Sequence, residues 1–183
     1  MKLTVNTKAL LDAVGMVAAA VASRTTLPVL GFIKATAGED GSLVLVGTDQ
    51  DIGVRFEIRG VDVKRAGSCM LPPHRLIAIL RETSDETIAI DANTDVTKIK
   101  AGRGKYEFLA VDPDTFPDLP TVETGDNFHE VTAGALRKLI RRVAFAADKV
   151  EGTRWAVTGV KWEVSADKFT LIATNTKHLA VST

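Results

Sequence analysis

The sequence is poor in the residues that build metal centres and covalent catalysis. Its single cysteine, Cys69, cannot form an internal disulfide or a metal site made of several thiolates, and its apolar neighbours predict a buried structural thiol. The three histidines, His74, His129 and His178, lie far apart and lack the paired spacing of a zinc site. The phosphate-binding pattern GxxxxGKS/T is absent. We therefore predict no catalytic residue, no metal and no cofactor.

The chain also lacks net charge and long apolar runs. Lys and Arg together number 23, as do Asp and Glu, so any basic surface must be local and offset by acid elsewhere. No apolar stretch approaches the roughly 20 residues that span a bilayer. Residues 9–22 superficially resemble a secretion signal, but Asp12 interrupts them and their apolar residues follow a helical period. We predict a cytosolic protein without a membrane partner.

A basic amphipathic helix is predicted over residues 132–149. Its apolar residues recur at steps of three and four, which places them on one helix face: Leu136, Leu139, Ile140 and Val143. The other face carries two i,i+4 pairs of cations: Arg137, Lys138, Arg141 and Arg142. Such like-charge pairs destabilise an isolated helix by roughly 0.2–0.5 kcal/mol each. The cations form either a solubilising face or a surface for nucleic-acid phosphate.

Alternation and turn signals divide the chain into three β-α-β-β-β modules. The first has a strand at 2–5, a helix to residue 22, and strands at 29–36, 42–48 and 52–58. The second has a strand at 67–71, a short helix opened by two prolines, and strands at 87–91, 97–101 and 106–110. The third has a strand at 128–131, the basic helix, and strands at 157–164, 169–174 and 179–182. Residues 112–120 are predicted to be an extended linker.

An internal repeat relates the first and third modules. Val5 matches Val131, an offset of 126 (131 − 5), and the same offset holds through helix and later strand: Ala9 with Ala135, Leu10 with Leu136, Val17 with Val143, Ala18 with Ala144, Leu45 with Leu171, and Thr48 with Thr174. We predict one complete domain over residues 1–125 and the first half of a second copy over 126–183. A half-domain leaves strand edges and an apolar helix face uncovered, so we expect a longer chain or completion by another chain.

Four segments carry a resemblance to a known family. They are MKLTV at the N-terminus, RTTLPVLG at 24–31, GTD at 47–49 and TFPDLP at 115–120. They resemble the bacterial DNA polymerase III beta subunit, the sliding clamp. The resemblance implies an α+β DNA-clamp fold, with helices lining a pore and antiparallel sheets outside. It also implies a non-catalytic processivity factor: a head-to-tail homodimeric ring that encircles duplex DNA without sequence specificity and tethers the polymerase.

The resemblance also implies roles for particular residues. DNA-facing positions would be Arg24, Arg75, Arg81, the four cations of the basic helix, Lys149, Arg154 and Trp155. The edge strand that pairs with another subunit would contain Arg103, Lys105, Tyr106 and Phe108. One wall of the pocket for polymerase III and clamp-loader peptides would contain Val157, Thr174, Thr176, Lys177, His178 and Leu179. The family usually reads Thr-Asp-x-x-Arg-Leu-Ala there, and this chain has asparagine and histidine at the second and fifth positions.

Two other functions remain open from the residues alone. One is a nucleic-acid-binding module that uses the basic helix 132–149 without forming a clamp. The other is a hydrolase or transferase whose site is not visible in the sequence. Asp49 and Asp51 suggest a cation site, but we predict that they shape a turn between strands.

Overall fold

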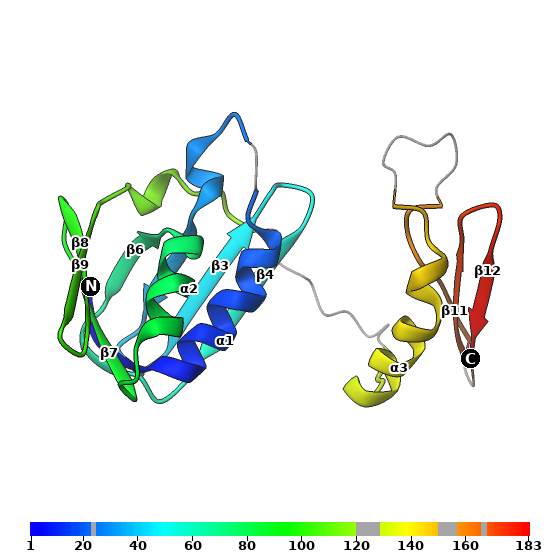
Figure 1. Ribbon diagram of the computed structural model, residues 1–183, viewed down its shortest axis with the longest axis horizontal. Coiled ribbons are helices and arrows are strands. Elements are labelled where there is room, and N and C mark those ends of the chain that lie inside the picture. Colours follow the sequence, from blue (N-terminus) through cyan, green and yellow to red (C-terminus); the bar gives the residue numbers. More distant parts are fainter. Residues whose placement is uncertain (23–24, 120–128, 150–156, 166–167) are drawn as a thin grey trace. The chain divides into compact units, whose positions relative to one another are not determined.

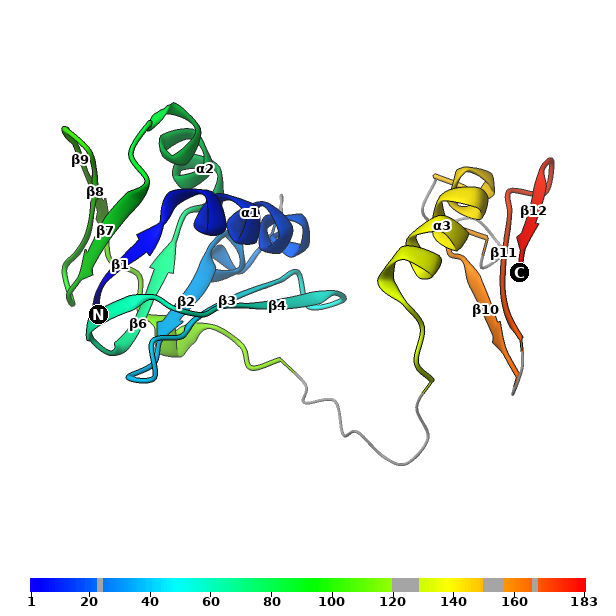
Figure 2. The same cartoon turned by 90° about the horizontal axis from the view of Figure 1, so that it is seen from below.

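The computed structural model describes residues 1–22, 25–119, 129–149, 157–165 and 168–183. The chain forms two compact units, Met1–Thr121 and Val122–Thr183. Both units combine antiparallel sheets with helices (Figures 1 and 2). Among the described residues, no helix is long and apolar enough to cross a membrane.

The first unit contains two antiparallel sheets and two helices. One sheet has the order β5-β1-β7-β8-β9, and the other has the order β4-β3-β2-β6. The strands of the first sheet are β1 (Lys2–Asn6), β5 (Asp62–Arg65), β7 (Thr87–Ala92), β8 (Val96–Ala101) and β9 (Gly104–Leu109). Those of the second are β2 (Ile33–Ala37), β3 (Leu43–Thr48), β4 (Gly53–Ile58) and β6 (Gly67–Leu71). Helices α1 (Thr7–Val17) and α2 (Pro73–Glu82) lie side by side and share one core with both sheets.

Helix α1 begins where the sequence supplies a cap. The Asn6 side-chain oxygen accepts a hydrogen bond from the Ala9 N–H at 3.0 Å, which satisfies one of the unpaired donors of the first turn. Leu10, Val14 and Val17 recur along one face and are fully buried. The helix then tightens into a 3-10 turn, η1 (Ala18–Ala20).

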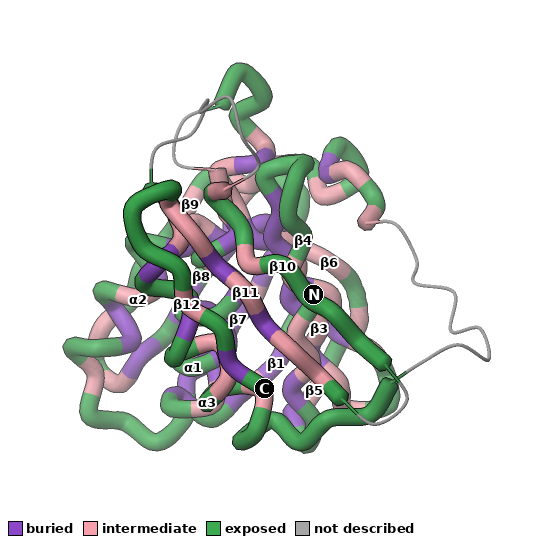
Figure 3. The backbone as a smooth tube through the Cα atoms, turned by 90° about the vertical axis from the view of Figure 1, so that its right-hand side faces the viewer, coloured by how far each residue is buried: buried purple, intermediate pink, exposed green. Residues whose placement is uncertain are grey.

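The second unit is smaller, and its described residues form one helix on one three-stranded sheet. Helix α3 (Ala133–Val143) is capped by the Thr132 hydroxyl, which accepts from the Ala135 N–H at 3.3 Å, and a 3-10 turn η4 (Ala144–Ala146) follows. The helix packs on a sheet of β10 (Lys161–Val164), β11 (Phe169–Thr174) and β12 (Leu179–Ser182). The buried residues of this core are Val143, Ala146, Leu171 and Ala173. Buried and half-buried residues alternate along β11 (Figure 3).

The repeat predicted from the sequence is present in the structure. Shifting α1, η1 and β3 by 126 residues gives the bounds of α3, η4 and β11 (7 + 126 = 133, 18 + 126 = 144, 43 + 126 = 169). The turns after β3 and β11 also match. Thr48 donates to the Ile52 carbonyl at 2.8 Å, and Thr174 donates to the His178 carbonyl at 2.7 Å.

The turn after β3 accounts for Asp49, the first of the two aspartates that suggested a cation site. The Asp49 carboxylate accepts from the backbone N–H groups of Asp51 and Ile52 at 3.0 and 2.8 Å. These hydrogen bonds lower the pKa of Asp49, and the bond from Ile52 has the largest effect. Asn175 makes the equivalent bonds in the second unit, which confirms a turn-forming role for this position.

Several sequence predictions of strands were wrong. The strand expected at 29–36 starts only at Ile33, because Pro28 opens a 3-10 turn, η2 (Pro28–Gly31). Strand β5 was not predicted because three of its four residues are charged. Residues 129–131 form no strand, and the strand expected at 157–164 begins at Lys161, after a bend at Thr158 and Gly159. A lone strand without hydrogen-bonded neighbours is not stable. The helices expected to reach residues 22 and 149 end earlier, at Val17 and Val143, and each continues as a 3-10 turn.

The contact between helix α1 and strand β3 gives a test of the packing. A Cβ at Gly47 would lie 2.8 Å from Val17 Cγ1 and 2.9 Å from the Val17 carbonyl oxygen, which is backbone. We therefore expect Gly47→Ala to lower the free energy of unfolding by about 1–3 kcal/mol. Gly15→Ala is the matched control, because its Cβ meets nothing within 4 Å and it should stabilise the helix by about 0.5–1 kcal/mol. Urea unfolding followed by circular dichroism measures both, and a neutral Gly47→Ala would contradict this packing.

Candidate nucleic-acid interface

The four cations of α3 lie together on its exposed face. Arg137, Lys138, Arg141 and Arg142 are all exposed, and with Gly134 they line a shallow recess of about 360 Å³. On the opposite face Leu139 and Ile140 pack against the core that contains Val143. None of the four cations forms an ion pair with another described residue. The predicted division of this helix into an apolar and a basic face is confirmed.

The repeat shows that the fold does not require this charge. The residues 126 positions earlier, on α1, are Leu11, Asp12, Gly15 and Met16, none of which is basic. Arg141 and Arg142 lie in the last turn of α3, where they interact favourably with the helix dipole. Arg137 and Lys138 lie before that turn, so the helix dipole does not account for their charge. The basic face is therefore a property of this helix and not of the module.

The remaining predicted DNA-facing residues are distributed over other segments. Arg75 and Arg81 are exposed on α2, and Arg81 lies in its last turn. Lys149 is exposed beyond η4. Arg24, Arg154 and Trp155 lie outside the described residues. Helices α2 and α3 belong to different compact units, so each basic face is a surface of its own unit.

The predicted subunit interface lies on an edge strand. Among the described strands, β9 pairs only with β8, so its other edge carries free backbone hydrogen-bonding groups. Arg103, which precedes the strand, and Lys105 and Tyr106 within it are exposed, whereas Phe108 is half-buried. Leu109 is 83% exposed, and it was not included in the predicted interface. The prediction followed the aromatic residues Tyr106 and Phe108, which alternate with Leu109 and so lie on the other face of the strand.

Most of the predicted peptide-pocket wall lies in one turn. The segment from Thr174 to Leu179 connects β11 to β12, and Leu179 is 70% exposed. Val157 lies in a different segment, where its carbonyl accepts from the Asp148 N–H at 2.9 Å. Val181 and its cross-strand partner Ile172 were not predicted, although they extend the apolar surface of Leu179 on the sheet face away from the core. The alternation of apolar residues along β11 and β12 could have identified these two residues from the sequence.

The environment of Cys69 is not that of a reactive thiol. Cys69 is buried, as predicted, and that burial raises the pKa of its thiol to about 12. At neutral pH the thiol is therefore protonated and a poor nucleophile. Within the described ranges, no group of three His, Cys, Asp or Glu residues is placed to hold a metal ion.

Antiparallel sheets under paired helices, built from a repeated module, define the DNA-clamp fold class. The family model for the N-terminal domain of the DNA polymerase III beta subunit matches residues 1–120. The chain belongs to this DNA polymerase III beta subunit family.

Relatives of known name and structure extend the match over nearly the whole chain. The beta sliding clamp of Bacillus subtilis (strain 168) is 31% identical over 99% of this chain and 49% of that protein. That of Halalkalibacterium halodurans is 33% identical over 92% of this chain and 46% of that protein. The crystal structure of the Bacillus subtilis clamp has a TM-score of 0.86, at 31% identity over 99% of this chain and 49% of that one. A Pseudomonas aeruginosa clamp bound to griselimycin has a TM-score of 0.89, at 26% identity over 99% and 48%. The chain spans about half the length of the curated relatives that it matches.

Proposed function

We propose that this chain is part of a sliding clamp that acts as a processivity factor for the replicative DNA polymerase. Membership of the beta subunit family supports this function, and the four cations of α3, absent from its counterpart α1, are the observation that favours DNA as the ligand. Lys and Arg attract phosphate without reading sequence, and exchangeable contacts of this kind permit sliding. Enclosure of the duplex, and not tight binding, keeps such a clamp on DNA. It is a non-catalytic subunit that acts on the chromosome in the cytoplasm.

The DNA-facing set in this proposal contains the cations of α3, Arg75 and Arg81 of α2, Lys149, and the loop residues Arg24, Arg154 and Trp155. Exposure of the described members supports it. The proposed domain division is a complete clamp domain at 1–125 and the first half of a second at 126–183. The offset of 126 between α1 and α3 supports that division.

We propose one surface for the ring contact and another for the partner proteins. We place the subunit contact of a head-to-tail homodimer at β9, through Arg103, Lys105, Tyr106 and Phe108, because this strand has a free edge. We place one wall of the pocket for the polymerase III catalytic subunit and the clamp loader at Val157 and the turn from Thr174 to Leu179. The exposed leucine and valine of β12 provide the apolar contact that such a peptide needs.

A DNA-binding module that forms no clamp is the competing function. It would bind linear duplex tightly through α3 alone, because all of its retention would come from direct contacts. The family match does not favour it. The affinity for linear duplex therefore distinguishes the two functions. A segment of a clamp should bind linear duplex weakly, and a DNA-binding module should bind it tightly.

Charge reversal on α3 tests the DNA-facing role. We expect Arg137→Glu with Arg141→Glu to weaken duplex binding by the 183-residue chain and to reduce the slope of log K against log salt by about 2. Lys161→Glu with Lys168→Glu changes the net charge equally, on β10 and just before β11, and should leave the slope unchanged. Fluorescence anisotropy over a salt series gives these values, with circular dichroism to confirm folding. An unchanged slope in the variant with Arg137→Glu and Arg141→Glu would indicate that the basic face of α3 only makes the chain soluble.

Substitution of Leu179 tests the pocket wall. Because this side chain is 70% exposed, Leu179→Ser should change the free energy of unfolding by less than about 0.5 kcal/mol. It should weaken binding of the clamp-binding peptide of the polymerase by about tenfold, the loss typical of an apolar anchor. The control is Ile52→Ser, 61% exposed in the equivalent turn of the first unit. NMR titration measures both affinities, and equal affinities would place the peptide elsewhere.

A further inference from the structure

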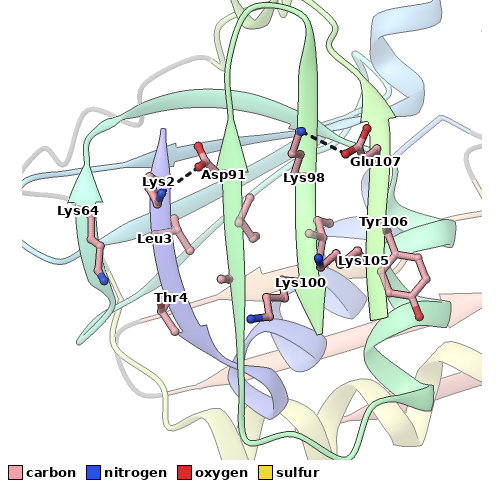
Figure 4. Close-up of a pocket in the computed structure, with 13 residues that line it drawn as sticks. Lys2, Leu3, Thr4, Lys64, Asp91, Lys98, Lys100, Lys105, Tyr106 and Glu107 are labelled. Carbon is pink, nitrogen blue, oxygen red and sulfur yellow. Dashed lines mark ion pairs between the residues drawn. The ribbon is translucent and has the colours of Figure 1, made fainter. Parts of the chain in front are cut away.

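A lysine-rich recess lies on the outward face of the five-stranded sheet of the first unit (Figure 4). Its volume is about 520 Å³, and residues of all five strands line it. Leu3, Ile90 and Ile99 are buried in the core, so strand alternation turns their neighbours to the opposite face. Five lysines line the recess: Lys2, Lys64, Lys98, Lys100 and Lys105.

In one row of residues across this face the charges pair with one another, and Arg65 of β5 also contacts Asp91, at 3.0 Å. Lys2 contacts Asp91 at 3.1 Å, and Lys98 contacts Glu107 at 3.2 Å. The strand register places Asp91 opposite both Lys2 and Lys98, so opposite charges alternate across four strands. The hydrogen bond from Lys2 is the first cause that lowers the pKa of Asp91. Such cross-strand pairs stabilise a sheet and need no ligand.

The neighbouring row is different. Thr4 lies opposite Ala89, Ala89 opposite Lys100, and Lys100 opposite Lys105. On β5, Asp62 is the register partner of Thr4, and Lys64 lies at the irregularity between Val63 and Arg65. The small residues Thr4 and Ala89 lie between β5 and Lys100 of β8, and Figure 4 shows Lys64 and Lys100 on either side of Thr4. Like charges directly opposite each other destabilise a sheet. Lys64 and Lys100 form no ion pair with any described residue, so their charge is available to a ligand.

We propose that this recess binds an extended acidic segment of a partner protein. Lys64 and Lys100 are separated by three strand spacings, or about 14 Å. In an extended peptide, side chains four residues apart are separated by about 13–14 Å and point to the same side. Two carboxylates at positions i and i+4 therefore match the two ends of the recess, with small residues between them over Thr4 and Ala89.

A peptide fits this surface better than a nucleic-acid strand does. The carboxylates of Asp91 and Glu107 border the recess. A nucleic-acid strand carries a charge on every nucleotide and meets those carboxylates wherever it crosses the sheet. A peptide can place neutral residues beside them and its own carboxylates only at the lysines. This site is distinct from α3 and does not depend on the proposed function.

The experiment is an NMR titration of the isotope-labelled chain. The probe is the capped peptide Glu-Gly-Ser-Gly-Glu, and its control is Gln-Gly-Ser-Gly-Gln. We expect the glutamate peptide to shift the amide signals of Thr4, Ala89 and Lys100, and the glutamine peptide to shift none. Lys64→Gln with Lys100→Gln should weaken binding about fivefold or more. Lys8→Gln with Lys168→Gln removes the same charge from exposed positions elsewhere and should weaken it less than about twofold.

A second variant separates binding from folding. Lys100→Glu places an acid opposite Lys105, so it should raise the urea midpoint of the chain while it abolishes binding of the glutamate peptide. The proposal is overturned if the two peptides give equal shifts, if neither gives any, or if the lysine variants bind as the unaltered chain does. It is also overturned if a short oligothymidylate, and not the glutamate peptide, binds with the same dependence on Lys64 and Lys100.

Discussion

The burial of one helix face against an antiparallel sheet holds each repeated unit together. In the first unit Val17 of α1 and Leu45 of β3 are fully buried, and in the second Val143 of α3 and Leu171 of β11 take the same places. This contact fixes which face of the helix is buried and leaves the other face free of packing constraints. That freedom lets α3 carry four cations where α1 carries none at the same positions. The same module can therefore serve as scaffold in one copy and as a charged surface in the next.

Local signals in the sequence predicted the elements that depend on local structure. The apolar period of Leu136 to Val143 located α3, and alternation located β11 and β12 to the residue. Strand β5 was missed because its charged residues look like a loop until β1 pairs with them. The basic face of α3 was predictable because it lies on one helix. The lysine recess was not predictable in this way, because Lys64, Lys100 and Thr4 lie on one sheet only through the pairing of strands far apart in sequence.

Charge in this chain is segregated by surface, which the zero net charge conceals. Cations gather on the exposed face of α3 and in the recess of the five-stranded sheet, whereas the carboxylates nearest that recess are paired with lysines. Local concentration of unpaired cations draws anionic ligands to particular places without making the whole chain adhere to polyanions. This segregation supports our proposals that the helix faces phosphate and that the sheet binds peptide carboxylates.

The most direct test of the clamp function is retention on DNA with and without free ends. The assembled clamp that contains this chain would be loaded onto a nicked circular plasmid, separated from free protein by gel filtration, and then exposed to a restriction enzyme that linearises the plasmid. Enclosure predicts that the clamp stays on the circle at moderate salt and is lost after linearisation. Retention on linear DNA equal to that on the circle would contradict it, because direct contacts alone would then hold the protein.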